Sequence, residues 1–268
     1  MKKLFFTIFT LFLAFNAMAH SFKVDGIYYL QNGNEAWVTY RGRDYYEYNN
    51  EYYGSVMIPE SVAYNGITYN VTHISSYAFA DCTSLTSVTI PNSVTSIGEA
   101  AFWGCSSLSS VTIPNSVTSI KGNAFSYCSS LSSITIPDSV TSIGSEAFSY
   151  CSSLSSVTIG KSVKSIDSYA FEKCTRLYDI YCYASTPSSV SESSFGNYNV
   201  YLHVPCEYKR DYELDDLWGK FKYIECFDSN TAVEDIITED TSVEKLIRNG
   251  QLIIVVDGVE YDVMGNKL

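Results

Sequence analysis

Apolar and polar positions recur along the middle of the chain with a fixed period. Each unit reads Cys-x-x-Leu-x-x-Val/Ile-x-Ile and continues to a further Ile and an Ala-Phe pair. The cysteines that mark the units are each 23 residues from the next: Cys82, Cys105, Cys128, Cys151 and Cys174. A fixed period of this length indicates a solenoid of stacked coils, each built from one unit.

The apolar spacing predicts one short strand in each coil. In the first unit Leu85, Val88 and Ile90 are expected to point inward. Ser87 and Thr89 alternate with them and are therefore expected to face outward, because successive side chains of a strand lie on opposite faces.

After the strand the chain must turn back. Pro91 ends the strand because it lacks a backbone donor. Val94 and Ile97 return inward, and Ala101-Phe102 fill the turn with a small and a large side chain. One unit cannot bury its own apolar face, so the coils are expected to stack about 4.8 Å apart with their strands parallel.

Altered copies flank the regular units, so the repeat region is expected to span 58–205. Near its start, Ala63–His73 is an insertion, and its Asn65-Gly66 pair predicts a hairpin that projects from the solenoid. Near its end, Val200–Pro205 is interpreted as the last strand. The period and the L-x-x-V-x-I spacing are typical of leucine-rich repeats, so the predicted fold class is a β-rich leucine-rich-repeat solenoid.

Both ends of a solenoid need a cap, because an uncapped stack exposes its core. Residues 20–57 predict an N-terminal cap with a hairpin that turns at Asn32–Asn34. The five tyrosines within Tyr45–Tyr53 suit either a packed cap surface or a contact patch. Residues 206–227, which include Trp218 and Phe221, predict the C-terminal cap.

The last part of the chain differs in composition. Residues 228–242 are polar and acidic and indicate a linker. Residues 243–268 hold three strand-like runs separated by Asn249-Gly250 and Asp257-Gly258, which predict a three-stranded meander. Such a small module must pack on something, pair with a partner or serve as a recognised tag.

Residues 1–19 are interpreted as a secretory signal peptide. Lys2 and Lys3 precede the apolar run Leu4–Phe15, and Ala17–Ala19 is a small-x-small cleavage site. No later run is long and apolar enough to span a membrane, so we expect an exported mature chain without a transmembrane segment.

The charge balance narrows the choice of partner. The chain has 17 basic and 29 acidic residues and a net charge of -12, which argues against nucleic acid and anionic lipid as partners. Within the repeats the charges nearly cancel, so the sheet face is not expected to steer partners electrostatically.

The row of five cysteines suits a buried filler, a metal site or a redox site. The absence of a C-x-x-C pair and the count of 3 His favour the filler, with the thiols free. Cys182, Cys206 and Cys226 lie outside the row, and a bridge between Cys206 and Cys226 is one open possibility.

The sequence contains no recognisable catalytic constellation. It has no G-x-S-x-G and no glycine-rich phosphate loop. His20, His73 and His203 are better explained as surface or packing residues than as catalytic bases. We therefore expect no enzymatic activity, no catalytic residue, no cofactor and no metal.

The remaining candidate for function is the outward face of the strands. Its expected members stand in columns: Ser87, Thr89, Ser110, Thr112, Ser133, Thr135, Ser156, Thr158, Asp179 and Tyr181. Sheet faces of solenoids bind proteins or glycans. Plain solubility combined with strand propensity explains the same residues equally well.

The unit C-x-x-L-x-x-V-x-I-P-x-S-V-x-x-I-x-x-x-A-F, from Cys82 to Phe102, resembles the BspA-type leucine-rich repeats of bacterial surface proteins. The resemblance covers about 55–205. Phe22–Tyr29 and Trp218–Phe221 are similar to the end segments of such proteins in Gram-negative anaerobes. Gly258–Gly265 resembles the C-terminal sorting module of the type IX secretion system.

The resemblance implies display on a cell surface and adhesion to host matrix proteins or to other bacteria. It also implies that the secretion machinery engages 243–268. It supplies no site residues, because binding in the family is spread over a variable surface. We therefore expect a binding module for an extracellular protein or glycan. The alternative is a structural envelope protein without an external ligand.

Overall fold

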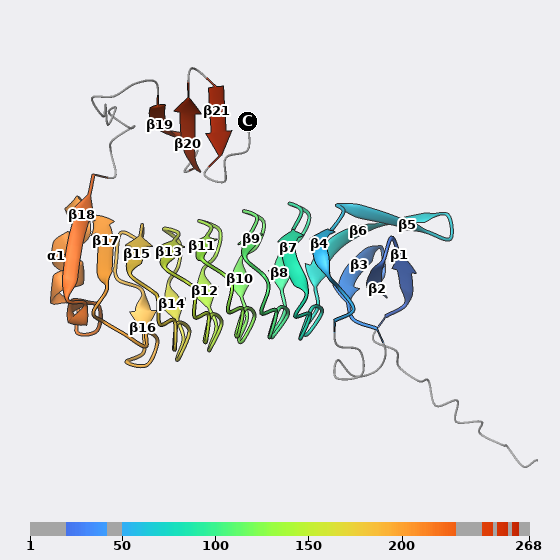
Figure 1. Cartoon of the computed structure of the whole chain (residues 1–268), viewed down its shortest axis with the longest axis horizontal. Helices are drawn as coiled ribbons and strands as arrows, with labels where there is room; N and C mark the ends of the chain where they lie inside the picture. The colour runs from blue at the N-terminus through green and yellow to red at the C-terminus, as the bar shows by residue number, and fades with distance from the viewer. Residues whose placement is uncertain (1–19, 42–49, 229–242, 249–250, 257–258, 263–268) are drawn as a thin grey trace, which may run out of the picture.

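The structure is a computed structural model of the 268-residue chain and describes residues 20–41, 50–228, 243–248, 251–256 and 259–262. The predicted signal peptide at 1–19 lies outside these residues, as does the predicted linker except for its first residue. Figure 1 shows the repeats as a row of coils, with the strands of successive coils side by side.

One strand from each coil forms the outer face of the solenoid, as the repeat pattern predicts. These strands are β4 (Gly54–Met57), β7 (Leu85–Thr89), β9 (Ser110–Thr112), β11 (Ser133–Ile136), β13 (Ser156–Ile159), β15 (Asp179–Cys182), β17 (Tyr201–Pro205) and β18 (Tyr223–Phe227). Every pairing among them is parallel. The fold class predicted from the period, a parallel β-solenoid of leucine-rich repeats, is confirmed.

The coils also pair along a second sheet that the sequence did not reveal. Its repeat strands have only two residues each: β8 (Ser96–Ile97), β10 (Ser119–Ile120), β12 (Ser142–Ile143), β14 (Ser165–Ile166) and β16 (Ser189–Val190). Each contributes one apolar residue inward, and all of these strands are parallel. The second sheet therefore runs unbroken through the repeat coils from β8 to β16.

The N-terminal strands extend this second sheet. They are β1 (Phe22–Val24), β2 (Ile27–Asn32), β3 (Glu35–Thr39), β5 (Ser61–Tyr64) and β6 (Ile67–Ile74). The antiparallel pairings β2–β3 and β5–β6 confirm both predicted hairpins, and β3 and β6 pair in parallel. The far end of β6 pairs with β8, so the inserted hairpin joins the N-terminal strands to the solenoid.

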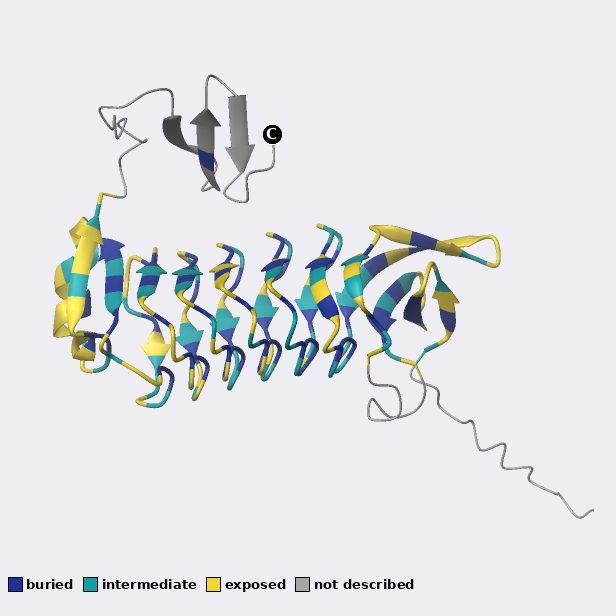
Figure 2. Ribbon diagram, in the orientation of Figure 1, coloured by how far each residue is buried: buried dark blue, intermediate teal, exposed yellow. Residues whose placement is uncertain are grey.

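The core runs along the solenoid as columns of identical side chains. Leu85, Leu108, Leu131 and Leu154 are each 0% exposed. Six phenylalanines stack with successive ring centroids 4.9 to 5.4 Å apart, in the order Phe79, Phe102, Phe125, Phe148, Phe171 and Phe195. Figure 2 shows the buried positions recurring in every coil. This confirms the expectation that each coil covers the apolar face of its neighbour.

The C-terminal cap closes this core with aromatic side chains. Between β17 and β18 the chain forms a 3₁₀ turn (Cys206–Tyr208), the helix α1 (Lys209–Leu214) and a second 3₁₀ turn (Trp218–Lys220). Trp218 is fully buried and packs edge-on against Phe195, the end of the phenylalanine column. Its indole Nε1 donates a hydrogen bond to the Ser188 carbonyl at 2.8 Å, so its polar group is satisfied.

The interpretation of Val200–Pro205 as the last strand is wrong. β18 adds one further parallel strand beyond β17. A disulfide between Cys206 and Cys226 ties β18 to the start of the cap, which settles the possibility that the sequence left open. The sequence did not predict β18, because buried and exposed residues do not alternate along this strand. Glu225 and Cys226 are both exposed.

The tail forms the three-stranded antiparallel meander that its turn signals predict. Its strands are β19 (Val243–Arg248), β20 (Gln251–Val256) and β21 (Val259–Asp262). The two turn pairs between them lie outside the described residues.

Candidate functional site

The strand register builds the candidate site on the outer face. Ser87 pairs with Ser110, and Thr89 pairs with Thr112. In the next group of strands Ser133 pairs with Ser156, which pairs with Asp179. Thr135 likewise pairs with Thr158, which pairs with Tyr181. The ten predicted residues therefore stand in two columns that run across the strands. None of them is buried, and the exposed ones are Thr89, Thr112, Ser133 and Thr135.

The sequence pattern suggested that the outward strands share one sheet. The outer face instead consists of two separate sheets. β4, β7 and β9 form a three-stranded sheet, and β11, β13, β15, β17 and β18 form a five-stranded one. No ladder joins β9 to β11 among the described residues, although these strands belong to consecutive coils. The 23-residue period of the sequence sets the order of the coils, but it does not determine how many successive strands join one hydrogen-bonded sheet.

Hydroxyl groups on this side of the coils bond mainly to neighbouring coils. Ser87 Oγ donates to Ser55 Oγ at 2.7 Å, and Ser155 Oγ donates to the Ser132 carbonyl at 3.0 Å. Such bonds account for part of the serine content as stabilisation between coils. Thr112 and Thr135 are themselves exposed.

The cysteine row is buried, as the filler interpretation requires. From Cys105 onward each thiol donates to the carbonyl of the phenylalanine 26 residues earlier, at 3.0 to 3.2 Å. Burial raises the pKa of Cys82 to about 11 and that of Cys174 to about 12, and raises the pKa of the three thiols between them well above the usual value. The thiols therefore stay protonated and inert at neutral pH. All five are free.

The C-terminal end of the outer face differs from the hydroxyl columns. Tyr201 and Tyr223 follow Asp179 in the first column, and His203 and Glu225 follow Tyr181 in the second. The sequence placed His203 at an outward position but did not include these four residues in the site. The alternation of apolar and outward residues within β17 could have identified Tyr201 and His203 as members of the site. β18 has no such alternation, so Tyr223 and Glu225 could not be identified in this way.

This end is tightly organised around His203. Its Nε2 lies 2.9 Å from Asp179 Oδ1, and its Nδ1 lies 3.7 Å from Glu225 Oε2. Tyr181 stacks on the imidazole with ring centroids 4.4 Å apart. Burial, and then the Asp179 carboxylate, raises the pKa of Tyr181. His203 is thus held on the sheet surface by its three neighbours.

His73 and Tyr52 are also engaged in packing. His73 packs against Trp37 with ring centroids 4.7 Å apart. Tyr52 is buried, and its hydroxyl donates to the Thr39 carbonyl at 2.6 Å, which fits a packed cap. Tyr53 is exposed, and residues 45–49 of this stretch lie outside the described residues.

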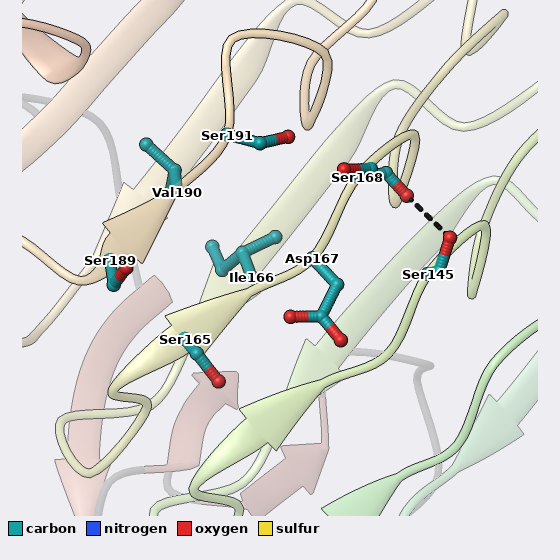
Figure 3. A pocket seen from close by; sticks show the side chains of 8 residues that line it. All are labelled: Ser145, Ser165, Ile166, Asp167, Ser168, Ser189, Val190 and Ser191. Carbon is teal, nitrogen blue, oxygen red and sulfur yellow. Dashed lines mark hydrogen bonds between the residues drawn. The ribbon is translucent and has the colours of Figure 1, made fainter.

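A hollow of about 380 Å³ lies on the second sheet, where β14 meets β16. Serine hydroxyls line most of it, and Figure 3 shows Ser145 bonded to Ser168 at its edge. Its one carboxylate, Asp167, is exposed. A wide hollow without a buried charged group favours solvent over a tightly held ligand.

Among the described residues, no three His, Cys, Asp or Glu side chains are grouped so that they would hold a metal ion. No helix among the described residues has the length and apolar character needed to cross a membrane.

Stacked coils, most of them with the Leu-x-x-Val-x-Ile strand, define the class of this protein: a leucine-rich-repeat solenoid. A family model for the BspA type leucine rich repeat region matches six copies over residues 56–201. The chain belongs to this family. No curated protein matches the sequence.

Solved structures of bacterial leucine-rich-repeat proteins resemble the chain. A leucine rich repeat protein of T. pallidum (TpLRR) is 31% identical, with a TM-score of 0.50 over 60% of this chain and 70% of that protein. A leucine rich cell surface protein of Faecalibacterium prausnitzii is 25% identical, with a TM-score of 0.51 over 92% of this chain and 59% of that protein. The pneumococcal vaccine antigen PcpA is 21% identical, with a TM-score of 0.60 over 76% of this chain and 47% of that protein, and shows the fold alone.

Proposed function

We propose that this chain is an exported, cell-surface binding module that contacts an extracellular protein or glycan through the outer face of its solenoid. The observation that carries the proposal is the pair of columns on that face. Their side chains lie outside the core and are held in register by the parallel ladders within the two outer sheets, so they form a firm surface. Solenoids use such surfaces for binding.

The cell-surface part of the proposal draws on sequence and on relatives. Residues 1–19 have the pattern of a signal peptide, and the similar F. prausnitzii protein is described as a cell surface protein. A role as an adhesin for host matrix proteins, glycans or other bacteria follows from the family resemblance. The chain spans 59% of the F. prausnitzii protein and 47% of PcpA, so whatever those longer proteins do beyond the repeats is not transferred to this chain.

The tail has a separate proposed role, as a tag that the secretion machinery recognises. Its three strands form a module distinct from the solenoid sheets. Deleting 243–268 is expected to leave the repeats folded and to retain them inside the cell. If the shortened chain reaches the surface in normal amounts, the tail is not a sorting signal.

Protease shaving of intact cells, followed by a pull-down on extracellular matrix, tests the main proposal. We expect shaving to release the repeats and matrix to retain the purified chain. Recovery of the chain only with cell-wall fractions, with no retention on matrix, would instead favour a structural envelope protein.

A further inference from the structure

The two outward columns change character at the C-terminal end of the solenoid. Between β7 and β13 they hold serine and threonine, whereas from β15 to β18 they hold tyrosine, histidine and carboxylates. We name these residues the C-terminal patch: Asp179, Tyr181, Tyr201, His203, Tyr223 and Glu225. Because serine and threonine serve the fold at the same positions in four coils, packing does not require these replacements.

The patch is a connected cluster. Tyr201 stacks on Tyr223 with ring centroids 4.5 Å apart and interplanar angle 13°, next to the stacked pair of Tyr181 and His203. His203 lies between the two carboxylates. Tyrosine is among the residues that contribute most of the binding energy in protein interfaces.

The charges of the patch indicate the chemistry of its partner. The Glu225 side chain is 57% exposed, so its carboxylate is open to a second ion pair. Lys222 Nζ already lies 4.9 Å from the centroid of the Tyr223 ring, which shows that an ammonium group is accommodated at this end of the patch. Neighbouring coils contribute no lysine or arginine to these two columns.

We propose that the C-terminal patch binds a basic protein segment, with lysine or arginine side chains pairing with Asp179 and Glu225 and packing on the tyrosines. This inference deepens the proposed function and rests on it: it locates the strongest contacts at one end of the outer face and names a cationic polypeptide as the partner. The hydroxyl columns then extend the contact surface along the coils.

The repeats themselves supply variants that keep the fold. Asp179→Ser with Glu225→Thr gives the patch the residues of the preceding columns and removes its carboxylates. Tyr201→Ser with Tyr223→Ser does the same for the stacked tyrosines. The matched control, Glu99→Gln with Glu146→Gln, removes two carboxylates from the turns that follow β8 and β12.

Each variant of the full chain is titrated with a labelled peptide that alternates lysine and serine, and with the same peptide acetylated on its lysines, at physiological ionic strength. We expect the wild type to bind the lysine peptide and not the acetylated one, and each patch variant to weaken binding by at least about tenfold. The control is expected to change it less than about twofold. Circular dichroism melts confirm that each variant is folded.

Equal losses in the patch variants and the control would overturn the inference, because binding would then follow net charge alone. Unchanged binding by the patch variants, or equal binding of the acetylated peptide, would overturn it as well. The proposed function fails separately, when the chain is not retained on extracellular matrix. If both patch variants are still retained on matrix, the proposed function is supported, but the C-terminal patch has no part in it.

Discussion

Single residues in this protein act through the columns to which they belong. Leu131 is 0% exposed and is flanked by Leu108 and Leu154, the equivalent residues of the adjoining coils. Its inward position follows from the sequence pattern alone, since alternation and period agree. The Cys206–Cys226 disulfide could not be predicted with the same certainty, because the sequence spacing permits this pairing but does not require it.

Leu131→Ala is expected to lower the free energy of unfolding by about 2–5 kcal/mol, because the removed methyl groups leave a cavity between two rigid neighbours. Urea denaturation followed by circular dichroism measures this loss. A variant as stable as the wild type would contradict the inward placement of this residue.

The buried thiols make the fold sensitive to alkaline pH. Their pKa in the folded chain is raised by burial above the ordinary value of 9.0, to about 11 at Cys82 and about 12 at Cys174. The unfolded chain therefore loses these protons first as the pH rises, so folding stability is full below about pH 9 and falls toward pH 11 to 12.

Cys128→Ala removes one such thiol, and burial holds its folded pKa well above the usual value. We expect the free energy of unfolding of this variant to fall less steeply above pH 9, by about 1.4 kcal/mol per pH unit. Urea titrations at a series of alkaline pH values give both slopes. Parallel slopes would show that the thiol ionises equally in both states.

At the scale of the element, the sequence predicted some strands and missed others for physical reasons. The outer strand β7 alternates over five residues, which is long enough to recognise. The strands of the second sheet have two residues, so they form only because the coil before and the coil after supply backbone partners. β18 has two adjacent exposed residues, so it lacks the two-residue alternation by which a strand is recognised in a sequence.

The turns after the second sheet depend on close approach between coils. A Cβ added at Gly144 would lie 2.6 Å from Gly122 N, whereas one added at Gly122 would meet only Ser145 O, at 3.3 Å. Gly144→Ala is therefore expected to cost about 1–3 kcal/mol. Gly122→Ala, the matched control, is expected to cost less than about 1 kcal/mol. Thermal melts compare the two, and equal stabilities would show that the coils do not approach this closely.

At the scale of the whole molecule, identical coils produce a long surface of low charge that ends in a patch of different chemistry. The stacking order, the two hairpins and the tail meander were predictable, because they follow from period and turn residues. The split of the outer face after β9 and the assembly of the C-terminal patch were not, because both depend on pairing between coils. The hydroxyl columns were predicted as positions, and their binding role stays a prediction.

Retention on immobilised extracellular matrix, compared among three forms of the chain, tests most directly whether the outer face binds. The first is the wild type, the second carries Ser110→Lys and Thr112→Lys on β9, and the third carries Asn115→Lys and Thr118→Lys elsewhere in the same coil. We predict that the β9 variant melts at the wild-type temperature but binds at least about tenfold more weakly, while the third form binds normally. Wild-type binding by the β9 variant would contradict a binding role for the hydroxyl columns of this face.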